Sequence, residues 1–175
     1  MVDESTLLRL YRRKVLAEPD TLPFQFDYGG TDIEKLIPHR DPFLFLDRLF
    51  ALDLENATLA GQKRLIPDSS FFKGHFPDFP VFPGSLQVET IGQLGLCLHH
   101  FVGRNTYLID DGASSPDVRA TRICGAYFRS ELRPGDDMVI LARLVEHDAY
   151  LGKILGQVTL RGEVAAVALL EVVFL

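Results

Sequence analysis

The chain has 175 residues, 47% of them hydrophobic, and a formal net charge of −6. This length and hydrophobic content are enough for one domain with a sizeable core, without metals or disulfides. The negative charge and the lack of a long basic run exclude the electrostatic surface that sequence-independent nucleic-acid binding requires. We therefore expect no nucleic-acid partner.

The cysteines and the N-terminus indicate a cytoplasmic protein. Cys97 and Cys124 lie in apolar stretches without C-x-x-C spacing, which favours buried free thiols. The N-terminus has acidic residues before its apolar residues and arginines among them, the reverse of a signal peptide. No apolar stretch is long enough to span a bilayer, so we expect no membrane span.

The first thirty residues are predicted to form an N-terminal extension, followed by the main domain at residues 31–175. Apolar residues within 4–17 have the spacing of an amphipathic helix, with Arg12, Arg13 and Lys14 on its other side. Such a helix could dock on a membrane surface or a partner, but packing on its own domain is the favoured interpretation. Residues 18–31 contain Pro, Gly and Asp and are interpreted as a link.

The rest of the chain predicts strands on both sides of one long helix. After a short turn at 32–36, strands are expected in the second half of IPHRDPFLFLDRLFALD and at 57–66. A connection at 103–119 should hold one short strand at 106–109. The runs at 121–132, 137–146, 151–160 and 163–175, separated by turn residues, predict an antiparallel meander.

The long helix is expected from about Gly84 to about Phe101. Pro83 suits a helix start because its missing N–H has no intrahelical partner there, and Gly84 allows close approach to the backbone. From Leu86 onward the helix is apolar on nearly every side, which indicates burial all round. The predicted fold is therefore α+β, with a curled antiparallel sheet wrapped around one long central helix.

Glu89 is the first candidate for chemistry. It lies in the second turn of this apolar helix, where an isolated ionised carboxylate is costly, so we expect its pKa to be raised. A carboxyl group that stays protonated near neutral pH can act as a general acid. The structural alternative is a buried Glu89 bonded to the backbone or to Gln93, one turn later.

His75 is the second candidate. It lies in the rigid segment GHFPDFP among phenylalanines, and a neutral imidazole is a suitable base near pH 7. Together, His75 and Glu89 bracket the start of one helix, which favours a catalytic pair over two structural residues. The N–H groups of Gly84 and Ser85, with the helix dipole, could polarise a carbonyl and acidify the adjacent carbon.

The segment GHFPDFPVFPGSLQVETIGQ resembles the signature GHFP-x-x-P-x-x-PG-x-L-x-x-E-x-x-x-Q of the bacterial 3-hydroxyacyl-acyl-carrier-protein dehydratase family (FabZ/FabA-like, closer to FabZ). IPHRDPFLFLDR and AYFRSELRPGDDMVI are similar to further family segments, so the resemblance covers residues 33–175. It implies a hotdog fold, no cofactor, and a homodimer in which His75 of one chain faces Glu89 of the other. Dimers could assemble further.

The resemblance also implies a role for each site residue. His75 would remove the C2 proton of a (3R)-3-hydroxyacyl chain, Glu89 would protonate the departing hydroxyl, and the Gly84 N–H would hold the thioester oxygen. Water and a trans-2-enoyl thioester would result, in fatty-acid or polyketide-type biosynthesis. Gln93 would position the Glu89 carboxyl group. The acyl tunnel would be lined by Phe76, Phe79 and Phe82.

The implied partner, an acyl carrier protein, is acidic and calls for a local basic surface. The candidates are Lys73, Arg122, Arg129, Arg133 and Lys153. Two alternatives stay open: a hotdog acyl thioesterase, in which an acid activates water, and a non-catalytic subunit that binds acyl carriers. Departures from the family pattern leave acyl chain length and pathway open; they are Asp41, Phe82, Ser85, Thr90 and Gly92.

The other histidines are assigned no catalytic role. His39 belongs to the PHR segment, which in the family is a structural entry to the first strand. His99, His100 and His147 have no acid or cysteine at a metal-ligand spacing, and His99 and His100, late in the helix, are interpreted as capping residues. We expect no metal site.

Overall fold

The computed structural model describes residues 3–148 and 150–175. Its antiparallel sheet has seven strands in the order β1-β2-β3-β5-β6-β7-β4. The strands are β1 (Phe24–Gly29), β2 (Arg48–Asp53), β3 (Thr58–Arg64), β4 (Val118–Phe128), β5 (Asp137–His147), β6 (Leu151–Leu160) and β7 (Glu163–Phe174). The helices are α1 (Glu4–Tyr11), α2 (Gly30–Leu36), α3 (Ser70–Gly74) and α4 (Gly84–Arg104), with a 3₁₀ turn at Pro19–Thr21.

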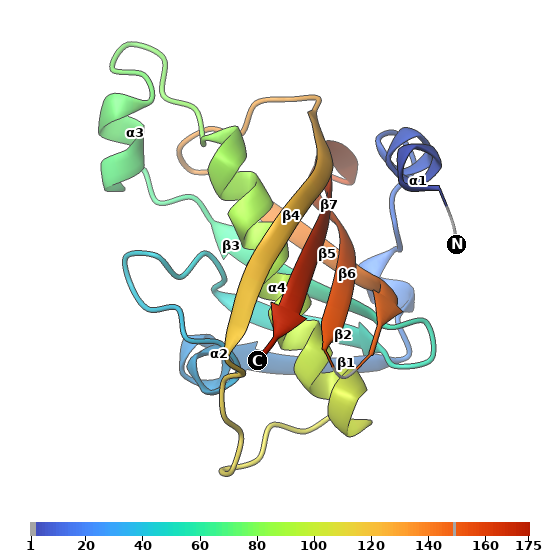
Figure 1. The fold of residues 1–175 in the computed structure, drawn as a ribbon. Helices are drawn as coiled ribbons and strands as arrows, with labels where there is room; N and C mark the ends of the chain where they lie inside the picture. Colours follow the sequence, from blue (N-terminus) through green and yellow to red (C-terminus); the bar gives the residue numbers. More distant parts are fainter. Residues whose placement is uncertain (1–2, 149) are drawn as a thin grey trace.

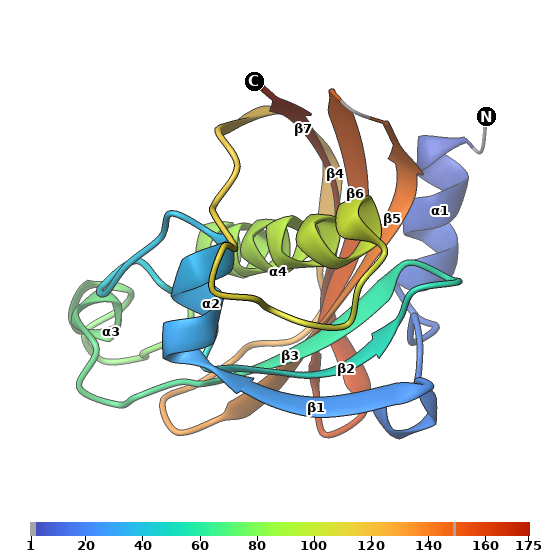
Figure 2. The same cartoon turned by 90° about the horizontal axis from the view of Figure 1, so that it is seen from below.

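The sheet curls around α4, so that strands face the helix from two sides (Figures 1 and 2). Ile91, Leu94, Leu98 and Phe101 of α4 are fully buried against this concave face. The predicted α+β fold with one long central helix is confirmed. The helix runs on to Arg104, where Asn105 in the left-handed conformation (φ 47°) ends it.

Two glycines allow α4 and β6 to lie unusually close together. A Cβ atom on Gly95 of α4 would lie 2.4 Å from Ile154 Cδ1, and one on Gly156 of β6 would lie 2.3 Å from Ile91 Cγ2. Each isoleucine therefore occupies the space that a side chain would take at the facing glycine. This contact sets the depth of the helix in the curled sheet.

The outer face of the sheet carries a second apolar cluster. Leu8 and Leu16 pack against Leu141, Leu155 and Val167, and α1 lies against the side of the sheet away from α4 (Figure 2). The N-terminal helix therefore packs on its own domain, as favoured from the sequence. It ends at Tyr11, short of the predicted residue 17.

Gln157 of β6 explains this early end. Its amide nitrogen donates to the carbonyls of Tyr11 (2.5 Å) and Lys14 (2.7 Å), and its oxygen accepts from the Leu16 N–H (2.7 Å). The side chain thus provides hydrogen-bond partners that a longer helix would have supplied from its own backbone.

Three elements differ from the sequence-based prediction. The segment interpreted as a link at 18–31 contains β1, so the sheet begins at Phe24, within the range predicted as the extension. Residues 106–109 form no strand, since the Thr106 N–H bonds back to Phe101 at the end of α4. The short helix α3 was not predicted. No helix among residues 3–148 and 150–175 is both long and apolar enough to cross a membrane.

Candidate active site

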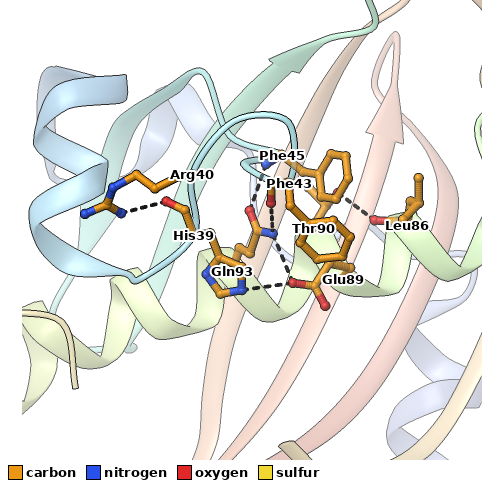
Figure 3. A network of polar contacts seen from close by, with 8 residues as sticks. All are labelled: His39, Arg40, Phe43, Phe45, Leu86, Glu89, Thr90 and Gln93. Carbon is orange, nitrogen blue, oxygen red and sulfur yellow. Dashed lines mark hydrogen bonds and ion pairs between the residues drawn. The ribbon is translucent and has the colours of Figure 1, made fainter. Parts of the chain in front are cut away.

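Glu89 projects from the second turn of α4 into a network of polar side chains (Figure 3). Its Oε1 atom lies 3.2 Å from His39 Nε2 and accepts a hydrogen bond of 3.0 Å from Gln93 Nε2. The Glu89 side chain is 34% exposed and that of His39 is 21% exposed. The carboxylate is therefore oriented from two directions while one side stays open.

Gln93 is fixed in turn by the loop that precedes β2. Its Oε1 atom accepts from the Phe45 N–H (2.8 Å), and its Nε2 atom donates to the Phe43 carbonyl (2.9 Å) as well as to Glu89. The residue is only 1% exposed. Because both ends of the amide are bonded, its orientation is determined, and the donor faces the carboxylate.

The pKa of Glu89 is lowered, opposite to the sequence-based prediction of a raised value. The hydrogen bond with His39 lowers it most, burial opposes this, and the Gln93 donor lowers it further. The prediction was wrong because it treated the carboxylate as isolated in an apolar helix. Two donors that stabilise the charged form outweigh the desolvation.

A cavity of about 320 Å³ opens beside Glu89. It follows one stripe of α4, at Val88, Gly92 and Leu96, spaced four residues apart. The remaining lining residues are Pro38, His39, Ser85, Glu89, Gln93, Val118, Ala120, Arg122, Ile123, Leu170 and Val172. An apolar cavity with a few polar groups at one end is typical of a small-molecule site.

His75 lies just after α3, with its ring fixed by a carbonyl. Its Nδ1 atom is 3.0 Å from the Val81 oxygen, and the Val81 N–H bonds to the His75 carbonyl at 2.9 Å. A carbonyl oxygen only accepts, so Nδ1 of the neutral ring carries the proton and Nε2 is left as a base. His75 does not line the cavity beside Glu89, so one protomer does not bring the two residues together there.

The start of α4 is where the sequence predicts a carbonyl-binding site. Gly84 is the first helical residue, and the Leu86 and Gln87 N–H groups already bond to the Pro83 carbonyl. The N–H groups of the first turn lack intrahelical acceptors, so those of Gly84 and Ser85 are available. The Phe128 ring covers Gly84 so closely that a Cβ atom there would lie 2.9 Å from it.

The phenylalanines predicted for the acyl tunnel lie outside the cavity beside Glu89, and their role in an acyl tunnel stays a prediction. Phe82 is buried, whereas Phe76 and Phe79 are 53% and 45% exposed. None of the three lines the cavity beside Glu89. Gly92, named from the sequence only as a departure from the family pattern, and Leu170, which was not named, line this cavity instead.

The remaining histidines include two adjacent ones late in α4. His99 stacks on Phe174 with ring centroids 3.7 Å apart, and His100 is 7% exposed. Neither is the cap of α4, which is Asn105. Within residues 3–148 and 150–175, no group of three His, Cys, Asp or Glu side chains has the arrangement of a metal site.

The basic residues that were candidates for binding an acidic partner differ in exposure and in their ion pairs. Lys153 is 8% exposed and pairs with Glu4 and Glu146, each at 3.1 Å, so it is not a surface cation. Arg122 pairs with Glu4 at 3.0 Å. Arg133 likewise pairs with Glu131 at 2.9 Å. Arg122, Arg133, Lys73 and Arg129 are all exposed.

Comparisons with known proteins identify the family of the chain. The FabA-like domain family matches residues 37–168. A 3-hydroxyacyl-acyl-carrier-protein dehydratase FabZ of Halalkalibacterium halodurans is 35% identical over 135 residues, 77% of this chain and 90% of that protein. The FabZ protein of Xanthomonas campestris pv. campestris is 34% identical over 146 residues, 83% of this chain and 91% of that protein.

Solved structures share the fold. The dehydratase heterocomplex ApeI:P of Xenorhabdus doucetiae superposes with a TM-score of 0.64 at 18% identity, covering 82% of this chain and 90% of that chain. A thioesterase from Pseudomonas aeruginosa gives a TM-score of 0.50 at 15% identity, covering 73% of this chain and 80% of that chain. The fold is thus the hotdog fold, and the chain belongs to the FabA-like domain family.

Proposed function

We propose that this chain is a hydro-lyase that converts (3R)-3-hydroxyacyl-acyl-carrier-protein into the trans-2-enoyl form and water, in fatty-acid or polyketide-type biosynthesis. The observation that carries the proposal is the bond between His75 Nδ1 and the Val81 carbonyl. It leaves Nε2 as a base, while Glu89 presents a carboxyl group beside an apolar cavity. The FabZ relatives, similar over most of their length, support the same reaction.

The proposed dehydration uses three groups of the site. The Gly84 N–H binds the thioester oxygen and stabilises negative charge there, which acidifies C2. His75 Nε2 takes the C2 proton, the C3–O bond breaks with its electron pair on oxygen, and protonated Glu89 gives its proton to that oxygen. Water leaves, a C2–C3 double bond remains, His75 is protonated and Glu89 is ionised.

We further propose that each site combines two protomers, with His75 of one facing Glu89 of the other. The edge strand β4 supports this, because Ile123, Tyr127 and Phe128 on it are 63%, 43% and 53% exposed. An exposed apolar edge favours pairing with a second chain. Since Ile123 also lines the cavity, a copy bound there would lie beside Glu89.

The substrate carrier is proposed to be an acyl carrier protein, as the relatives' name states for them. Lys73, Arg129 and Arg133 are exposed and could contact its acidic surface. Assembly beyond a dimer and a cytoplasmic location stay predictions.

The test is incubation with 3-hydroxyacyl-acyl-carrier-protein, with enoyl product followed by mass spectrometry. His75→Ala and Glu89→Gln should each abolish turnover. Mixing the two inactive variants should restore activity to about a quarter of wild type after random subunit exchange, because each mixed dimer keeps one intact site. Release of free carrier thiol instead of enoyl product would establish a thioesterase, and carrier binding without turnover would establish a non-catalytic subunit.

A further inference from the structure

One titratable side chain in the cavity has no part in the dehydration steps above. His39, in the loop between α2 and β2, places Nε2 3.2 Å from Glu89 Oε1. Its other nitrogen, Nδ1, is buried and has no partner among the described residues. Most buried side-chain polar atoms in proteins have a hydrogen-bond partner, so this nitrogen is an exception. Within the part of the chain that the structure describes, the polar contact of the ring is with the proposed general acid.

The loop is held so that this contact persists. The Arg40 guanidinium donates to the carbonyls of Glu34 (2.9 Å), Ile37 (2.9 Å) and His39 (2.7 Å), the last of which appears in Figure 3. On the other side, Gln93 binds the backbone of Phe43 and Phe45. The imidazole is therefore fixed above the carboxylate from both ends of the loop.

Of the charged groups near His39 and Glu89, His39 is the one placed to donate a proton directly to the Glu89 carboxylate. Glu89 faces the ring from α4, and Arg122 of β4 lines the same cavity but pairs with Glu4. Arg40 turns toward α2, where it also lies 3.7 Å from Glu34. His75 of a second protomer would approach Glu89 only in the proposed dimer, where it serves as the base.

The chemistry requires a source of protons for Glu89. Each dehydration leaves Glu89 ionised, and its pKa is lowered, so a proton must be returned to it before the next turnover. Histidine is the side chain that exchanges protons most readily near neutral pH. With 21% of its side chain exposed, His39 can itself recover a proton from solvent.

We propose that His39 is a positioning residue that reprotonates Glu89. The Nε2–H bond of the His39 imidazolium breaks as an O–H bond forms on Glu89 Oε1, and the protonated carboxyl group then gives its proton to the C3 hydroxyl. Neutral His39 takes a proton from water to complete the cycle. This role rests on the proposed dehydratase function and assigns to His39 more than the structural role inferred from the sequence.

The test compares His39→Gln, which keeps a neutral donor near Glu89, with His39→Ala. Both variants should lose about 10- to 100-fold in kcat with little change in KM, and the pH dependence of kcat should change. The exposed His147→Gln variant is the matched control and should keep wild-type rates. Wild-type kcat and an unchanged pH profile in His39→Gln would overturn the relay.

Chemical rescue separates proton transfer from packing. Imidazole and its methylated derivatives should restore turnover to His39→Ala in the order of their pKa values, whereas filling of a void would follow their size. In the protein without substrate, the ring ¹⁵N signal of His39 Nε2 should change in Glu89→Gln; an unchanged signal would overturn the contact. A wild-type protein that forms no enoyl product would overturn the dehydratase itself, and the relay with it.

Discussion

The side-chain oxygen of Gln157, on the outer face of β6, accepts a hydrogen bond of 2.7 Å from the backbone N–H of Leu16. Its nitrogen donates to two further backbone carbonyls of the N-terminal segment, and the residue has no exposed surface. One amide thus joins the N-terminal segment to the middle of the sheet.

Gln157→Leu should therefore destabilise the fold. The change keeps the volume but leaves buried backbone groups without partners, and we expect a loss of about 3 kcal/mol in the free energy of unfolding. Urea denaturation measures this, and proteolysis should cut first within residues 12–23. An unchanged free energy of unfolding would show that water replaces the amide and that the segment is attached by its leucines alone.

Gly156→Ala tests the close approach of α4 and β6. The added methyl group would lie 2.3 Å from Ile91 Cγ2 and 3.0 Å from the Leu141 carbonyl. Overpacking of this kind costs about 1–3 kcal/mol. Thermal unfolding should show this loss.

Gly92→Ala is the matched control for that substitution. Its methyl group would meet Leu170 at an ordinary contact distance of 3.5 Å, and alanine favours a helix interior by about 0.5–1 kcal/mol. This variant should unfold at an equal or higher temperature. If both variants lost the same stability, the close approach at β6 would not be the cause.

The pKa of Glu89 also predicts a pH dependence of stability. The folded-state pKa lies below the ordinary glutamate value of 4.5. The stabilisation from the charged Glu89 carboxylate is therefore fully present above that value and is lost as the pH falls through the folded pKa. The difference in unfolding free energy between wild type and Glu89→Gln should therefore shrink below pH 4.5. Denaturation at several pH values measures it. A constant difference would mean that the hydrogen bonds do not depend on the charge of the carboxylate.

Much of the fold could be predicted from local patterns. The apolar character of α4 on all sides requires a sheet around it, and β6 was predicted with the correct bounds because turn residues mark both ends. The strand β1 was missed because prolines and glycines around it suggested a link. Its alternating Phe24, Phe26 and Tyr28 carried the two-residue period of a strand.

The candidate site could be predicted only in part. His75 and Glu89 belong to one motif, so their residue types were visible in the sequence. The contact of His39 with Glu89 depends on how the loop before β2 crosses α4, which no local pattern encodes. That contact is the largest cause of the lowered pKa of Glu89. Because the sequence did not reveal the contact, the prediction of a raised pKa was wrong.

The lining of the cavity along α4 leads us to predict an effect on acyl chain length. Gly92 lies between Val88 and Leu96 on its wall, and Leu170 is the nearest side chain to the Cβ position. Gly92→Val would add two carbon atoms beyond the single methyl group of alanine and narrow the cavity. If the acyl chain occupies this space, kcat/KM should fall about tenfold for long acyl chains and change little for short ones. Comparison of wild type, Gly92→Ala and Gly92→Val on a series of chain lengths measures this, and an equal loss for every length would place the acyl chain elsewhere.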